Sequence, residues 1–170
     1  MNSERTQIKR KQVSDPTRWI IGHIDLNDKF ILHYGEGKAF EDTRVLSALS
    51  GSFVATYDPH TKANDPSVLD VQYDVGISNY VFNTLLPATR AKAFSDMLAC
   101  CKRCIIAVRT DKVNGSPVLG YDGVTTSRDT FQTQLSADAW VEWFERMSPD
   151  RTSVEVLHNG GHFAIIDVWR

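Results

Sequence analysis

Hydrophobic and polar positions along the chain switch repeatedly between the spacing of a strand and the spacing of a helix. Short apolar runs predict strands at 29–34, 53–57, 73–79 and 104–109. Between them, apolar residues recur at helical spacing in 40–51 and 88–102, and 16–24 predicts a short helix with Pro16 in its first turn. Strands that alternate with helices are typical of a mostly parallel sheet with helices on both faces.

The C-terminal third departs from this alternation. A glycine-rich stretch, 113–123, predicts a loop, and it is followed by a short strand near 130–135 and a helix that begins at Ser136. The last two apolar runs, SVEVLH and HFAIIDVW, are separated by Asn-Gly-Gly at 159–161, which is a strong hairpin signal. We therefore predict an α/β fold with a doubly wound, mostly parallel sheet that ends in an antiparallel hairpin.

Length and charge limit the number of domains and the kinds of partner that we expect for this chain. The chain has 170 residues, a formal net charge of -2 and a pI near 6.2, so one domain is expected, without the overall positive field of a dedicated nucleic-acid binder. Its longest apolar runs are shorter than the roughly 18 to 20 residues that span a bilayer, and the N-terminus lacks a signal-peptide centre. We expect a cytoplasmic protein that does not enter membranes.

The N-terminal residues 1–15 are polar and basic without helical periodicity, which predicts a flexible tail ahead of a single domain at 16–170. A nucleic-acid or partner-binding arm is the alternative. Three cysteines, Cys100, Cys101 and Cys104, lie too close together for a disulfide framework, and there is no second Cys/His cluster to complete a zinc site. We expect them to pack in the core or at a helix end, and we expect no metal site.

Aromatic residues and histidines in the C-terminal third are interpreted mainly as structural. Trp140, Trp143 and Phe144 form an apolar stripe on the helix that begins at Ser136, which indicates core packing. His158 and His162 flank the hairpin signal and are expected to meet as a cross-strand pair.

The first strand runs into a Gly-x-Gly turn and then a helix, and this corner carries the candidate chemistry. Gly35 and Gly37 allow a sharp turn and close approach of a ligand, and the first strand-to-helix turn borders the crevice of an open α/β sheet. Asp58 ends the second strand about twenty residues later, at the position where a carboxylate accepts hydrogen bonds from ribose hydroxyls. A glycine corner and an Asp-Pro turn without a ligand explain the same residues equally well.

The segments ILHYGEGKA, VATYDP and YDVGISNYVFNTL, followed by PATRAKAF, together resemble the class I S-adenosylmethionine-dependent methyltransferases. The resemblance covers roughly residues 28 to 170 and includes the terminal hairpin, and it implies a Rossmann-like fold that binds S-adenosylmethionine. It implies cofactor contacts from the first strand and its turn, from the end of the second strand with His60 beside it, and from the end of the 73–79 strand. These cofactor-binding candidates are Tyr34, Gly35, Glu36, Gly37, Asp58, Pro59, Ser78 and Asn79.

The same resemblance implies where the chemistry and the acceptor lie. Asn79 and Tyr80 would face the transferring methyl group and are the best catalytic candidates, although strand-end capping explains them too. The loop after the 104–109 strand would select the acceptor, with Arg109, Asp111, Tyr121 and Arg128 as candidates. The acceptor is unidentified, either a small molecule or a nucleic acid, and a partner protein is possible.

The sequence also departs from the family pattern. His33 stands where an acid commonly ends the first strand, Ala39 replaces a third glycine, and the stretch from Asp58 to Tyr73 is too short for a helix, a strand and a second helix. We therefore predict a trimmed sheet with less wall around the adenine, and either Glu36 takes over from the missing acid or cofactor binding is weakened. Two functions remain open: a small methyltransferase, or a non-catalytic protein of this fold that binds or regulates, in association with nucleic acid in one version.

Overall fold

A six-stranded sheet forms the centre of the computed structural model, which describes residues 11–38, 40–49, 51–61 and 64–170. The strand order is β2-β1-β3-β4-β9-β8, and its members are β1 (Phe30–Tyr34), β2 (Phe53–Tyr57), β3 (Tyr73–Asn79), β4 (Cys101–Arg109), β8 (Ser153–Gly160) and β9 (Phe163–Trp169). The first four strands pair in parallel, whereas β9 pairs antiparallel with both β4 and β8. The predicted α/β sheet with a terminal antiparallel hairpin is confirmed.

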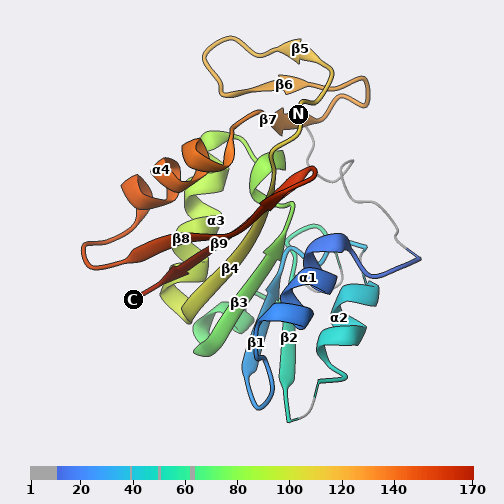
Figure 1. Cartoon of the computed structure of the whole chain (residues 1–170), viewed down its shortest axis with the longest axis vertical. Coiled ribbons are helices and arrows are strands. Elements are labelled where there is room, and N and C mark those ends of the chain that lie inside the picture. The colour runs from blue at the N-terminus through green and yellow to red at the C-terminus, as the bar shows by residue number, and fades with distance from the viewer. Residues whose placement is uncertain (1–10, 39, 50, 62–63) are drawn as a thin grey trace.

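Helices cover both faces of this sheet, as predicted. On one face lie α1 (Asp15–His23) and α2 (Phe40–Leu46), and on the other lie α3 (Pro87–Cys100) and α4 (Ala137–Met147); Figure 1 shows α1 and α2 on the near side. Strand β4 is apolar from Cys104 to Val108, because Ile105 packs toward α1 while its neighbour Ile106 packs toward α3 and α4. Each face thus buries its own half of the core.

Several element boundaries differ from the prediction. Helix α2 ends at Leu46 rather than near residue 51, and α3 ends at Cys100, so β4 already begins at Cys101. Cys100, Cys101 and Cys104 are buried and free, which confirms their expected place at a helix end and in the core.

The N-terminal helix α1 begins at Asp15, inside the segment 1–15 that was predicted as a flexible tail. Ser14 is the N-cap of α1, where its side chain accepts a hydrogen bond from the Thr17 N–H, and it is buried. Ser14 and Asp15 therefore belong to the folded domain, while residues 1–10 of the predicted tail lie outside the described residues.

The predicted trimming of the sheet is also found. Between β2 and β3, residues 58–61 and 64–72 hold a 3₁₀ helix, η2 (Pro66–Asp70), and neither a strand nor an α-helix. Because no strand pairs outside β2 in this part of the chain, β2 forms one edge of the sheet.

The stretch predicted as a loop and one strand forms a second sheet. Its three antiparallel strands are β5 (Ser116–Pro117), β6 (Gly123–Thr125) and β7 (Phe131–Thr133). It lies at the top of Figure 1, beyond the turn that joins β8 to β9. The loop prediction was wrong because strands of two or three residues leave too few positions to show alternation.

The hairpin turn falls two residues later than its sequence signal. Asn159 and Gly160 still belong to β8, and Gly161, with φ of +65°, begins the turn. His158 consequently lies opposite Ile165, and the expected cross-strand pair with His162 is not formed. The predicted core role of the α4 aromatics is confirmed, since Trp140, Trp143 and Phe144 are all buried.

Candidate functional site

A cavity of about 580 Å³ opens where β1, β2, β3 and β4 end, which is where ligands bind in open α/β sheets. Nine of the residues singled out from the sequence line it: Tyr34, Gly35, Glu36, Gly37, Asp58, Pro59, Asn79, Tyr80 and Arg109. His60 lines it too, whereas Ser78 is fully buried and does not. Residues from four separate segments therefore meet at one place.

The glycine turn after β1 needs its glycines for conformational reasons. Gly35 and Gly37 have φ of +75° and +58°, in the left-handed region that side chains disfavour. The Gly35 N–H donates to the Tyr57 carbonyl at 2.7 Å, and a Cβ on Gly35 would lie 2.3 Å from a methyl carbon of Val81. The turn is thus fixed against both β2 and the segment after β3.

Asp58, at the end of β2, ties two backbone segments to one buried carboxylate. Its Oδ2 accepts a hydrogen bond from the Gly37 N–H at 2.8 Å, and its Oδ1 accepts one from the His60 N–H at 2.8 Å. Since a carboxylate offers about four lone-pair sites, the same oxygens can also accept hydrogen bonds from a ligand. The glycine turn and the acid therefore form one unit, although they are separated by 21 positions.

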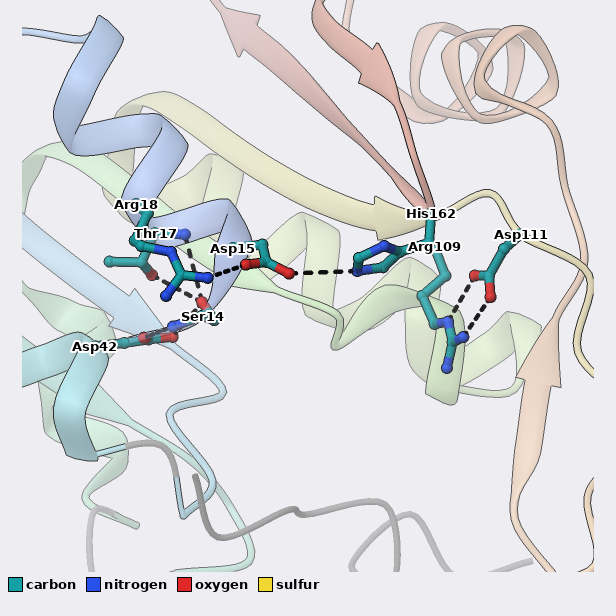
Figure 2. Close-up of polar contacts among 8 residues, drawn as sticks. All are labelled: Ser14, Asp15, Thr17, Arg18, Asp42, Arg109, Asp111 and His162. Carbon is teal, nitrogen blue, oxygen red and sulfur yellow. Dashed lines mark hydrogen bonds and ion pairs between the residues drawn. The ribbon is translucent and has the colours of Figure 1, made fainter. Parts of the chain in front are cut away.

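Asn79, at the end of β3, is held by a polar network that the sequence did not reveal. Asp42 accepts hydrogen bonds from the N–H and the hydroxyl of Ser14, both at 2.7 Å, as Figure 2 shows. The Asn79 amide donates to Thr17 at 2.7 Å and approaches the same Asp42 carboxylate at 3.4 Å. Its Oδ1 is buried and has no hydrogen-bond partner among the described residues, so the amide presents an acceptor that a ligand donor would satisfy.

Comparison with solved structures now identifies the architecture. The chain superposes on a SAM-dependent methyltransferase from Aquifex aeolicus with a TM-score of 0.65 and 12% identity, and the match covers 100% of both chains. It superposes on the 1,6-didemethyltoxoflavin-N1-methyltransferase of Burkholderia thailandensis, solved with its substrate and S-adenosylhomocysteine, with a TM-score of 0.63, 12% identity and coverage of 90% and 75%.

The chain has the class I S-adenosylmethionine-dependent methyltransferase fold. A Rhodobacter sphaeroides protein described as a Zn-dependent alcohol dehydrogenase matches as well, with a TM-score of 0.67, 11% identity and coverage of 100% and 98%. Neither a protein-family model nor a curated protein matches the sequence. At these identities the likeness establishes the fold, and the activity has to be argued from the residues of the site.

One wall of the cavity is formed by α3 together with the end of β2. The lining there includes Tyr57 from β2, Leu85 before α3, and Thr89, Lys92 and Asp96 from α3 itself. Lys92 donates to Asp96 at 2.7 Å, so the charges on this wall are paired. This wall therefore offers polar and apolar side chains to a ligand.

Tyr80 follows β3 in a conformation that is uncommon for a side chain of its size. Its φ is +61°, and its N–H donates to the Ala107 carbonyl at 2.9 Å. The ring lies near those of His162 and Phe163, with centroids 6.4 Å away in both cases. Strained backbone of this kind concentrates at ligand sites, and here it turns the chain along the cavity wall.

Two residues of the lining, Arg109 and His162, each lie against a carboxylate. Arg109 donates to Asp111 at 2.8 and 2.5 Å, and this contact lowers the pKa of the Asp111 carboxyl. His162, in the β8–β9 turn, lies 3.7 Å from Asp15 of α1, so the N-terminal helix and the hairpin meet beside the cavity (Figure 2). The interpretation of His162 as mainly structural did not anticipate this position in the lining.

Only part of the predicted substrate loop reaches the cavity. Tyr121 has 48% of its surface exposed and Arg128 is also exposed; both lie outside the lining, on the small sheet. Gln132 of β7 does reach the cavity, where its side chain accepts a hydrogen bond from Asn83 at 2.8 Å. These two amides were not singled out because they lie 49 positions apart and fit no local motif.

The described residues include no group of three or more His, Cys, Asp or Glu side chains that could hold a metal ion. None of their helices is both long enough and apolar enough to cross a bilayer.

Proposed function

We propose that this chain is an S-adenosylmethionine-dependent methyltransferase. The observation that carries the proposal is the hydrogen bond from the Gly37 N–H to Asp58, beside the carboxyl ends of the strands. It joins the glycine turn and the acid expected to bind ribose in one cavity wall. The neighbour from Burkholderia thailandensis, which has the same fold, was solved with S-adenosylhomocysteine, and this supports the choice of cofactor.

The chemistry of the lining fits that cofactor. Asp58 offers carboxylate oxygens for the ribose hydroxyls, and Tyr57, Pro59 and His60 provide a flat, partly apolar surface for adenine. Tyr34, Gly35, Glu36 and Gly37 would contact the methionine part. The unpartnered Asn79 Oδ1 gives the cavity a buried acceptor, which matches the polar donors of an amino-acid group.

The protein would contribute mainly by positioning. When bound, S-adenosylmethionine supplies a methyl group on a positively charged sulfonium, ready for displacement by a nucleophilic acceptor. Asn79 and Tyr80 would border the reacting centre, and Arg109, held by Asp111 outside the lining, would border the acceptor. Holding two reactants in line at about 3 to 3.5 Å accounts for roughly 7 to 11 kcal/mol of a barrier, so the chain needs no nucleophile of its own.

Titration calorimetry with S-adenosylhomocysteine tests the proposal. The wild-type protein should bind, and D58N should bind about 10- to 100-fold more weakly, because an amide in place of the carboxylate turns one of the two acceptor oxygens into a donor that faces an N–H group. D138N, at an exposed position of α4, is the matched control and should bind like the wild type.

Two outcomes would count against the proposal in different ways. No heat with wild-type protein at millimolar ligand contradicts cofactor binding altogether. Binding without methyl transfer to any small-molecule or nucleic-acid acceptor would instead support the alternative of a non-catalytic protein with this fold.

A further inference from the structure

His33 lies one residue before the end of β1, at the position where the resemblance leads one to expect an acid, and its surroundings show how a histidine can serve there. The side chain is 1% exposed and lines the cavity. Three carboxylates face it from different elements: Glu36 from the glycine turn, Asp42 from α2 and Asp58 from the end of β2. The imidazole therefore lies inside an acidic part of the cavity wall.

Two consecutive hydrogen bonds fix how this ring carries its proton. His33 Nδ1 lies 2.8 Å from the Thr43 hydroxyl oxygen, and the Thr43 hydroxyl lies 2.6 Å from Glu36 Oε1. A hydroxyl has one hydrogen and an ionised carboxylate can only accept, so Thr43 donates to Glu36 and accepts from Nδ1–H. In the neutral ring the lone pair is then on Nε2.

We propose that Thr43 and Glu36 are positioning residues that hold His33 as the Nδ1–H tautomer, so that its Nε2 accepts a hydrogen bond from the α-ammonium of the bound cofactor. The inference rests on the proposed function and specifies how the site recognises the amino-acid part of its ligand. It gives the histidine at this strand end a contact of its own with the ligand ammonium, and Glu36 supports that contact through Thr43.

Burial supports a neutral ring at this place. Desolvation lowers the pKa of His33 and outweighs the opposing pull of Asp42, Glu36 and Asp58. These carboxylates are themselves engaged, Asp42 by Ser14 and Asp58 by the Gly37 N–H. A neutral imidazole can accept from an ammonium group, whereas a protonated one would repel it.

Substitution of Thr43 tests the His33–Thr43–Glu36 chain of hydrogen bonds, called the relay below, without changing the other cofactor contacts. T43V removes the hydroxyl that joins the two side chains, and T43S retains it. S-adenosylhomocysteine should bind T43V about tenfold more weakly than wild type, and T43S should restore the affinity to within about twofold. The second probe is 5′-methylthioadenosine, which lacks the amino-acid group, and its affinity should be the same for all three proteins to within about twofold. Thermal melting of each variant controls for folding.

The pH dependence provides a readout that a purely structural role of Thr43 would not change. Affinity for S-adenosylhomocysteine should fall as the pH drops through the lowered pKa of His33, because protonation places a positive charge against the ligand ammonium. The affinity for 5′-methylthioadenosine should not follow this profile. In ¹⁵N-histidine spectra, with H33Q used for assignment, His33 should show a protonated Nδ1 and an unprotonated Nε2 at neutral pH.

Failure of the relay and failure of the proposed function look different. If the wild type binds neither probe, the proposed function is wrong. If it binds both but T43V keeps full affinity for S-adenosylhomocysteine, or if His33 carries its proton on Nε2, the relay is wrong. A flat pH profile together with loss of binding in E36Q would assign the ammonium contact to Glu36 instead.

Discussion

At the scale of single residues, Asp42 is a buried carboxylate of the cavity lining that holds two neighbouring side chains in place. It receives two hydrogen bonds from Ser14, at the start of α1, and lies beside the Asn79 amide. The contact with Ser14 joins α1 to α2 across 28 positions and places Ser14 in the cavity lining. Asn79 keeps its orientation because Thr17 and Asp42 hold its amide nitrogen, which leaves its oxygen toward the interior of the site.

We expect D42N to lower the free energy of unfolding by about 1.5 to 3 kcal/mol, because one Ser14 donor would face an amide NH₂ in a buried position. Urea unfolding followed by circular dichroism measures this loss. The control is E41Q on the same helix, which breaks only the surface pair with Arg44 and should change stability by less than about 1 kcal/mol. A D42N protein as stable as E41Q would show that the Ser14 contacts contribute little.

At the scale of elements, one buried arginine attaches the small sheet to the main domain. Arg90 of α3 is fully buried and donates to Asp122, just before β6, at 2.6 and 3.1 Å. It also donates to the Phe82 carbonyl at 3.0 Å, to the Leu85 carbonyl at 3.1 Å and to the Thr133 hydroxyl. The guanidinium lies over the rings of Trp140 and Trp143, at 5.0 and 5.6 Å from their centroids. Arg90 therefore links α3 and the segment after β3 to the small sheet.

The substitution D122N should loosen the small sheet while the main sheet stays intact. Losing the charge weakens the bidentate contact with Arg90, so amide protons in β6 and β7 should exchange with solvent about tenfold faster, while those of β3 and β4 keep their rates. Hydrogen exchange measured by NMR gives the rates for both sheets in one experiment. R128Q, on the exposed turn of the same sheet, is the control. Faster exchange throughout both sheets in D122N would mean that they open together.

The elements that sequence could predict are those with a strong local pattern. The run CIIAVR had to be a buried central strand because it is apolar on both faces, and Asn-Gly-Gly located the final hairpin to within two residues. Gly35, Asp58 and Asn79 could be assigned to one site because parallel strands end at the same edge. By contrast, Thr43, Arg90 and the Asn83–Gln132 pair act through contacts between distant segments, for which a single sequence carries no local signal.

At the scale of the whole molecule, the trimmed sheet concentrates its aromatic residues on the α3 side. Tyr34 and Tyr73 both belong to the core cluster that joins β1 and β3 to α3 and α4, and both are buried. The Tyr34 ring lies 5.4 Å from that of Tyr57 on the edge strand, so this cluster extends from the middle of the sheet to the cavity. Its stability depends on these phenols staying neutral.

Alkaline pH should destabilise the domain through these tyrosines. Burial raises the pKa of Tyr34 and also that of Tyr73, so the folded state retains protons that the unfolded state releases above pH 10. The corresponding stability is fully present below that pH and is lost progressively as the pH rises above it. Unfolding by urea at pH 8 and pH 11 should therefore show a smaller loss for Y34F than for the wild type. Y121F, at a half-exposed position, should keep the wild-type loss, and equal losses in all three proteins would contradict the argument.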